Sequence, residues 1–222
     1  SLQAVVQVRV YGVPFNSLRP VKYKFTDPVK GELYQPLVVI PPVEFNFVND
    51  NNISINDTAA GCQLFSKSNK KDSVSYHVTF NTSANWYIDR KDFIYGTWMQ
   101  NHSNYTSPYL RPKNKGLNLK ETVSISVNKE KTPIFSGEKK IIKYDHVPTI
   151  TYFKDAEANL LQLSLKTYNK KIGYITGAGD KVPEALEQMG FEVTLLGKKE
   201  LSKNNLNQFD AIITGVRAYN TH

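Results

Sequence analysis

The chain changes its sequence pattern at about residue 150, and this change constrains the fold more than any other feature. Before that point, apolar residues recur at every second position in short runs such as Val6-Val8-Val10 and Val21-Tyr23-Phe25. A period of two is typical of β-strands with one buried face. After that point, strand-like and helix-like segments alternate. The pattern therefore predicts an α+β chain, in which an antiparallel β-sandwich is followed by a parallel α/β unit.

Further short apolar runs support the first part of this prediction. Spacers rich in Asn, Ser, Gly and Lys separate them, and turn signals such as Pro41-Pro42 punctuate the chain. The predicted strands lie at 44–48, 53–55, 63–65, 74–80, 86–88, 123–127 and 139–144. The less regular segment 92–116 predicts a long loop packed by its own aromatic side chains. Many short strands without a helical period favour an immunoglobulin-like sandwich.

The second part contains the pattern of a βαβ unit. Predicted strands lie at 171–176, 191–196 and 210–214, and helical segments lie at 182–189 and 199–207. Asp180 is a suitable N-cap for the first helix, and Gly190 suits the position just after it. Strands connected in this way are expected to be parallel, with right-handed crossovers.

These patterns divide the chain into three parts. Residues 1–48 are predicted to form N-terminal strands and a connector, residues 49–147 the β-sandwich, and residues 148–222 a partial α/β domain. Segment 156–166 fits either a helix or a strand. Three parallel strands with one or two helices do not cover both faces of a sheet. Together with the start, which lacks Met and a signal peptide, this predicts a segment of a longer protein.

The net charge of +8 is spread thinly along the chain. Only 5 of the 28 basic residues are Arg, and lysines occur in pairs at most. Because Arg is the residue that reads bases by bidentate contacts, this distribution favours a solvated surface over nucleic-acid binding. No window approaches the roughly 18 consecutive apolar residues that span a bilayer, so no membrane span is expected.

The most specific candidate site lies where two predicted parallel strands end. The carboxyl ends of such strands meet at one sheet edge, where open α/β sheets bind ligands. The candidate ligand-binding residues are Gly177, Gly179, Asp180, Arg217, Tyr219 and Asn220. The first loop is not a dinucleotide fingerprint, because Val182 occupies the position of the third glycine. A tight strand-to-helix turn and an Asp180–Arg217 ion pair are the structural alternatives.

The sequence contains no motif for catalysis or metal binding. No two histidines have the spacing of metal ligands, so no catalytic residue, metal or cofactor is predicted for this chain. Cys62 is expected to be an inert thiol, because its strand-rich surroundings offer no activating base or helix. His146 is expected to form a hydrogen bond at the junction of the two predicted domains.

Five aromatic side chains are candidates for a surface that binds a sugar. They are Trp86, Tyr87, Trp98, Tyr105 and Tyr109. Core and loop packing accounts for them, and stacking on a sugar is the alternative.

Several segments of the sequence resemble a known family. They are Arg19–Pro36, Ile40–Phe47, Tyr144–Thr149, Lys170–Leu196 and Phe209–Thr221. Together they look like the C-terminal portion of the large PIG-L (LmbE-like) deacetylases of Bacteroidetes. The resemblance implies a zinc-dependent deacetylase domain, then β-sandwich modules, then a flavodoxin-like domain similar to class I glutamine amidotransferases. The family's zinc motif, His-Pro-Asp-Asp with a later His, does not occur in this chain, and neither does a Cys on a strand-to-helix elbow.

The resemblance implies a non-catalytic accessory region of an N-acetylsugar deacetylase, in the periplasm or secreted. Its role would be structural or would position saccharide, and its partners would be the deacetylase domain of the same protein and a saccharide. Two alternatives remain. One is an amidotransferase-like or hydrolase site at the sheet edge that uses Asp180 and Arg217, and the other is a carbohydrate-binding module.

Overall fold

β-Structure dominates the computed structural model, which describes residues 2–97, 99–144, 146–168, 170–202 and 206–221. Strands account for 57% of the described residues and α-helices for 8%. The strands are β1 Gln3–Val10, β2 Val13–Pro20, β3 Lys22–Asp27, β4 Gly31–Pro36, β5 Val43–Phe47, β6 Asn51–Ile55, β7 Ala60–Gly61, β8 Leu64–Ser68, β9 Val74–Asn81, β10 Trp86–Ile88, β11 Asp92–Thr97, β12 Ser103–Thr106, β13 Tyr109–Pro112, β14 Leu119–Lys129, β15 Thr132–Ile134, β16 Gly137–Tyr144, β17 Val147–Asp155, β18 Glu157–Leu163, β19 Lys171–Ile175, β20 Glu192–Leu196 and β21 Ala211–Thr214. The helical segments are α1 Val182–Gln188, α2 Lys198–Ser202, the 3₁₀ turn Leu206–Gln208 and α3 Ala218–Thr221.

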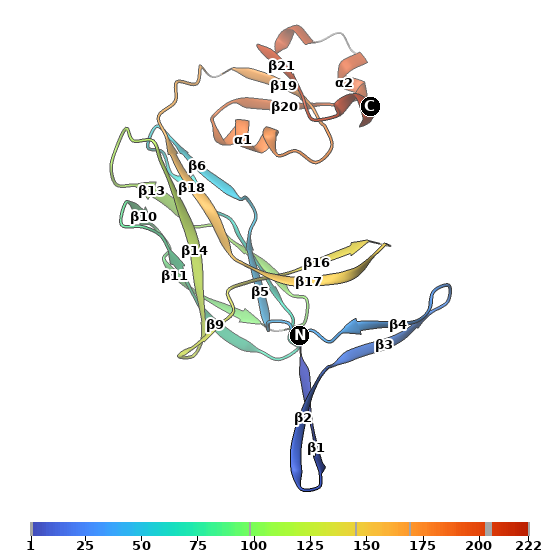
Figure 1. The fold of residues 1–222 in the computed structure, drawn as a ribbon. Helices are drawn as coiled ribbons and strands as arrows, with labels where there is room; N and C mark the ends of the chain where they lie inside the picture. Colours follow the sequence, from blue (N-terminus) through green and yellow to red (C-terminus); the bar gives the residue numbers. More distant parts are fainter. Residues whose placement is uncertain (1, 98, 145, 169, 203–205, 222) are drawn as a thin grey trace.

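The body of the molecule is built on one curled sheet. Its strand order is β11-β9-β14-β18-β6, and β15 pairs with β14. All of these pairs are antiparallel except β18 with β6, which is parallel. Two three-stranded sheets, β12-β8-β5 and β10-β13-β7, complete the body. The sheets curl into a half-barrel, which Figure 1 shows from its open side.

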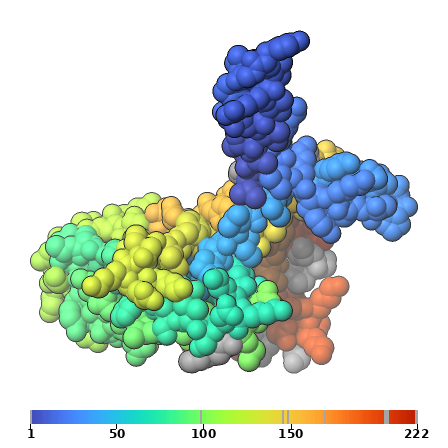
Figure 2. All heavy atoms as spheres, turned by 90° about the horizontal axis from the view of Figure 1, so that it is seen from below, coloured from blue at the N-terminus to red at the C-terminus, as the bar shows by residue number. Residues whose placement is uncertain are grey.

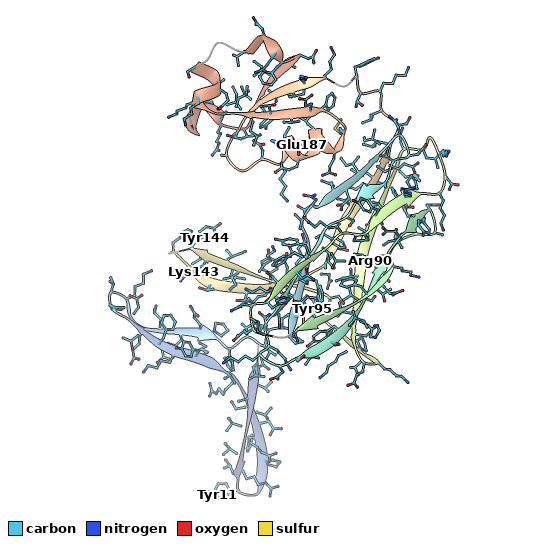
Figure 3. All side chains as sticks on the ribbon, turned by 180° about the vertical axis from the view of Figure 1, so that it is seen from behind. Tyr11, Arg90, Tyr95, Lys143, Tyr144 and Glu187 are labelled. Atoms are coloured by element: carbon cyan, nitrogen blue, oxygen red, sulfur yellow. The ribbon has the colours of Figure 1, made fainter. Side chains whose placement is uncertain are left out.

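The core of this body follows from strict alternation of side chains. Strand β5 alternates fully buried Val43, Phe45 and Phe47 with half-buried polar residues, as a strand with one core face requires. Phe45 packs edge-on against Tyr95, with their ring centroids 5.8 Å apart. Figure 3 shows Tyr95 within the body, between the sheets. This edge-to-face geometry is the one that aromatic quadrupoles favour.

Three two-stranded hairpins project from the body: β1-β2, β3-β4 and β16-β17. The first turns through Tyr11 and Gly12, whose φ angles are +48° and +82°. Two residues of positive φ make the tight turn whose twist matches that of paired strands. In Figure 2 this hairpin stands out from the surface of the body, and Tyr11 marks its tip in Figure 3. Val6, Val8 and Val10 are exposed. The strand predicted there is present as β1, but the buried face predicted for it was wrong.

The C-terminal part is a small sheet of order β20-β19-β21, in which both pairings are parallel. Helix α1 connects β19 to β20 and lies next to β6, where the Ile53 backbone N–H donates to Gln188 Oε1 at 3.1 Å. Helices α1 and α2 have seven and five residues and bury none of them. They therefore form no helical layers over the sheet.

The predicted fold class was wrong. The chain is mostly β with many antiparallel sheets, and residues 148–222 do not form a flavodoxin-like parallel α/β unit. Such a unit needs helices packed on both faces of its sheet, whereas α1 and α2 are short and contain no fully buried residue. The mostly β composition is compatible with a sandwich in the preceding part.

Two local predictions also change. Segment 92–116 was predicted to be a long loop, but it contains β11, β12 and β13. Segment 156–166, which fitted helix or strand, contains β18. Strand β18 follows the predicted boundary at residue 147, and β5 precedes the one at residue 49, yet residues of both contribute to one buried cluster.

Candidate functional site

The predicted ligand loop is held by a hydrogen-bonded carboxylate at the end of the parallel strands. Asp180 lies in the loop between β19 and α1. Its Oδ1 accepts a hydrogen bond of 2.7 Å from the Tyr174 hydroxyl, and its Oδ2 accepts one of 3.2 Å from the Val216 backbone N–H. The Ala178 N–H also donates to the Val216 carbonyl at 2.8 Å. The two loops that follow β19 and β21 are thus tied together, as neighbouring loops at one sheet edge can be.

Two glycines allow this close approach. A Cβ atom on Gly177 would lie 2.3 Å from the Val216 carbonyl oxygen, and one on Gly215 would lie 2.5 Å from Asp180 Oδ2. Gly179 has a φ of +73°, a conformation that favours glycine. Gly177, Gly179 and Asp180 therefore form a tight strand-to-helix turn, which was the structural alternative.

The tyrosine beneath this turn has a strongly perturbed acidity. Tyr174 is 1% exposed. Burial, the hydrogen bond to Asp180 and the negative charges of Asp180 and Glu184 together raise the pKa of Tyr174 to about 12. Each of these causes opposes formation of the phenolate. The hydroxyl remains a donor at neutral pH, so it serves to position Asp180.

The remaining candidates at this edge face outward. Arg217, Tyr219 and Asn220 are exposed, and Tyr219 and Asn220 lie in the short helix α3. The ion pairs between described residues do not include Asp180 with Arg217. The predicted pair is therefore replaced by the hydrogen bonds to Tyr174 and Val216. Both oxygens of Asp180 accept hydrogen bonds from the fold, so this carboxylate holds the two loops together.

The burial of Cys62 and the exposure of His146 decide what these two candidate residues do. Cys62 is fully buried, and burial raises the pKa of its thiol to about 12. This agrees with an inert thiol, because the thiolate is the reactive form. His146 is exposed beside the turn of the β16-β17 hairpin, where its ring stacks at 5.9 Å on Tyr144. The predicted role of His146 at a domain junction was wrong.

The aromatic candidates divide into two groups. Trp86 is 3% exposed and belongs to the core, whereas Tyr87, Tyr105 and Tyr109 are exposed. Trp98 lies outside the described residues. Among the residues that the structure describes, no group of three His, Cys, Asp or Glu side chains is placed to hold a metal ion. In the same part of the chain, no helix is both long and apolar enough to cross a bilayer.

Sequence reasoning missed one surface, the exposed apolar side chains of the three hairpins. Val8 on β1 and Phe15 on β2 face each other in the register and are 50% and 57% exposed. Val5 and Leu18 are also paired in the register, and they are exposed on the opposite face of the hairpin. The Tyr11-Gly12 turn, flanked by alternating valines, was the available signal for a hairpin. Nothing in the local pattern shows that both faces of this hairpin are exposed.

An apolar cleft lies where these hairpins join the body. Its volume is about 570 Å³, and its lining includes Leu2, Pro36, Val39, Ile150 and Phe153. The first three residues belong to the N-terminal strands and connector, and the last two belong to β17. The cleft therefore continues the apolar surface of the hairpins.

Comparisons with known proteins give weak similarities. No protein-family model matches the sequence, and no curated protein matches it. Similar solved structures include the C. elegans MSP family member WR4, with 6% identity over 55% of this chain and 97% of that chain and a TM-score of 0.30. A protein of unknown function from Porphyromonas gingivalis W83 has 11% identity over 62% of this chain and 60% of its own, with a TM-score of 0.31. A family 123 glycoside hydrolase from Clostridium perfringens has 11% identity over 60% of this chain and 30% of its own, with a TM-score of 0.27. These TM-scores are too low to establish a shared fold.

Proposed function

We propose that this chain is a non-catalytic accessory region of a PIG-L-type N-acetylsugar deacetylase, and that it docks onto the deacetylase domain through its hairpins. The observation that carries the docking role is the exposure of apolar side chains on both faces of the β1-β2 hairpin. The identity of the partner comes from the sequence resemblance. The localisation implied by that resemblance, periplasmic or secreted, is part of the same proposal.

A hairpin that packs against nothing gains little stability from its two strands. A two-stranded hairpin in water is marginally stable, because neither face is buried. Large exposed apolar patches on a protein surface mark sites of interaction. In β1-β2 the pairs Val8–Phe15 and Val5–Leu18 put such side chains on opposite faces. Another protein surface that covers these faces would remove apolar area from water, at about 25 cal/mol for each Å².

The other two hairpins extend the same surface. Tyr23 and Tyr34 on β3-β4 are exposed, as are Ile141 and Ile150 on β16-β17. Figure 1 shows all three hairpins projecting from one end of the body, away from β10 and β13. A single partner domain that inserts among them could contact every hairpin and the apolar cleft at their base.

The docking proposal is tested by binding to the deacetylase domain encoded in the same reading frame. The double variant Val8→Thr and Phe15→Thr keeps residues that favour strands but removes apolar area, and we expect it to weaken the complex by about tenfold or more. Ile94→Thr, which changes an exposed residue of β11 in the body, is the control and should bind normally. No complex with the wild-type chain, or an unaffected complex with the double variant, would overturn the proposal.

The non-catalytic part of the proposal has a separate test. Supplied with zinc and an N-acetylglucosamine substrate, this chain alone should release no acetate. Zinc-dependent release of acetate from a homogeneous preparation would overturn this part and leave the docking result to stand by itself.

A further inference from the structure

We propose that the outer face of the β10-β13-β7 sheet is a binding site for a neutral oligosaccharide. The site is defined by Tyr87, Asp89, Tyr109, Arg111 and Ala59, which line a depression of about 490 Å³. We name this surface the tyrosine shelf. It lies on strands other than those of the hairpins, so it goes beyond the docking role and does not depend on it.

Strand register places these side chains on one face. Tyr87 on β10 pairs with Arg111 on β13. Two residues along each strand, the Asp89 N–H donates to the Tyr109 carbonyl at 3.2 Å, and the Tyr109 N–H donates to Asp89 Oδ1 at 2.9 Å. Residues two apart in a strand share a face. The two tyrosines therefore lie on one diagonal of the shelf, and the two charged residues lie on the other.

The opposite face of the same strands anchors the shelf to the core. Trp86 and Leu110 alternate with the shelf residues and are 3% and 0% exposed. The Trp86 indole N–H donates to Glu121 Oε2 on β14 at 2.6 Å. A binding face built on strands whose inner residues are fixed is held more rigidly than one on a loop.

Space beside the rings is left open by two small residues. Gly61 pairs with Tyr109 across β7 and β13, and a Cβ atom on Gly61 would meet nothing within 4 Å. Ala59, just before β7, adds only a methyl group to the lining. Tyr87 and Tyr109 are 57% and 55% exposed, so their rings are accessible to a ligand.

The chemistry of the shelf favours a sugar. The ring of tyrosine presents an apolar face with a polar hydroxyl at one end, which suits a pyranose with apolar C–H groups on its faces and hydroxyls around its rim. Each sugar hydroxyl both donates and accepts. Arg111 offers guanidinium donors and Asp89 keeps Oδ2 as an acceptor, and neither forms an ion pair with another described residue.

The same pair of charges disfavours two other ligand classes. A phosphate would be repelled by the Asp89 carboxylate next to Arg111. A proline-rich peptide offers carbonyl acceptors but few N–H donors, so it would offer no donor to the remaining oxygen, Oδ2 of Asp89. An uncharged polyol satisfies both charged groups at once.

Binding is tested first on a glycan array of neutral oligosaccharides, including N-acetylglucosamine oligomers, and then by calorimetric titration of the glycan that binds. We expect Tyr87→Ala and Tyr109→Ala each to raise the Kd by about tenfold, the equivalent of losing roughly one ring contact. Tyr105→Ala is the matched control, because Tyr105 is equally exposed but lies on β12, in another sheet. It should bind normally, and unchanged circular dichroism should establish that all three variants fold.

Two results would overturn the proposal. One is the absence of binding to any glycan on the array, and the other is binding that survives both shelf variants or is lost equally in Tyr105→Ala. A folded protein that binds glycan normally but fails to bind the deacetylase domain would refute the docking role alone. The two proposals can therefore fail separately.

Discussion

The hydroxyl of Tyr174 donates a hydrogen bond of 2.7 Å to Asp180 Oδ1, and this contact joins strand β19 to the loop that precedes α1. The second oxygen of the same carboxylate accepts the backbone N–H of Val216, in the loop that follows β21. One side chain thus connects the ends of two parallel strands. This connection gives the small C-terminal sheet a fixed edge even though α1 and α2 contain no fully buried residue.

The raised pKa of Tyr174 predicts a loss of stability at high pH. The folded state holds the phenolic proton more tightly than the unfolded state, in which the pKa of a tyrosine is near its ordinary value of 10.0. The contribution of Tyr174 to stability is therefore complete below pH 10 and is lost as the pH rises toward 12. The slope is at most about 1.4 kcal/mol per pH unit.

Urea unfolding of the wild type and of Tyr174→Phe across this pH range measures the effect. The variant has no phenolic proton, so its free energy of unfolding should decline less steeply. Tyr76 and Tyr95 also have raised pKa values, but they are present in both proteins and cancel in the comparison. Equal slopes for the two proteins would contradict the prediction.

Gly177→Ala should loosen the edge of the C-terminal sheet. The new Cβ would lie within 2.3 Å of the Val216 carbonyl oxygen and 2.6 Å of its nitrogen, so the two loops must move apart. We expect a loss of about 1–3 kcal/mol, the usual cost of overpacking. Hydrogen exchange of the β19 amides is the measurement, and it should become faster.

Gly61→Ala is the control for this substitution. A Cβ at Gly61 meets nothing within 4 Å, so the free energy of unfolding should change by less than about 1 kcal/mol. Unchanged exchange at β19 in Gly177→Ala would show that the loops are not held together as described.

Much of the strand pattern could be predicted from sequence, because alternation is a local signal. The runs at 44–48, 74–80 and 86–88 correspond to β5, β9 and β10. Their alternation reflects one buried and one exposed face. The pairing of these strands was not predictable. The parallel contact of β18 with β6 joins residues more than a hundred positions apart.

For the candidate site, the sequence predicted where the loops lie but not which side chains bond to one another. The pattern located the loop at Gly177–Asp180 and the segment after β21 correctly at one sheet edge. It could not show that Asp180 bonds to Tyr174 and Val216, because side-chain partners depend on the packing of the folded chain. The alternating valines of β1 were equally ambiguous, since a period of two does not reveal whether the second face is covered.

Cys62 should react with thiol reagents only when the protein unfolds. The side chain is fully buried, and this burial raises the pKa of its thiol from the ordinary value of 9.0 to about 12. Because the thiolate is the nucleophile, modification at pH 8 should be slower in the native protein than in denaturant by about a thousandfold or more. A colorimetric thiol assay in buffer and in guanidinium measures this ratio. Comparable rates in the two states would contradict the described burial.

Glu121 is the residue whose charge holds β10 against the main sheet. Its carboxylate accepts hydrogen bonds from the Ser83 hydroxyl at 2.5 Å, the Asn85 side-chain amide at 2.8 Å and the Trp86 indole at 2.6 Å. Burial would raise the pKa of Glu121, but the three hydrogen bonds together lower it. A lowered pKa means that the stabilisation is present above about pH 4.5 and is lost as the pH falls through the folded-state value.

Glu121→Gln tests this role, because the neutral amide has about the same size but offers a single acceptor oxygen. We expect a loss of roughly 1–3 kcal/mol in the free energy of unfolding at neutral pH, with a weaker dependence on pH below 4.5 than the wild type shows. Glu157→Gln changes an exposed carboxylate on neighbouring β18 and should alter neither quantity. If both variants behave alike in denaturant titrations at neutral and acid pH, the three hydrogen bonds do not stabilise the strand that carries the tyrosine shelf.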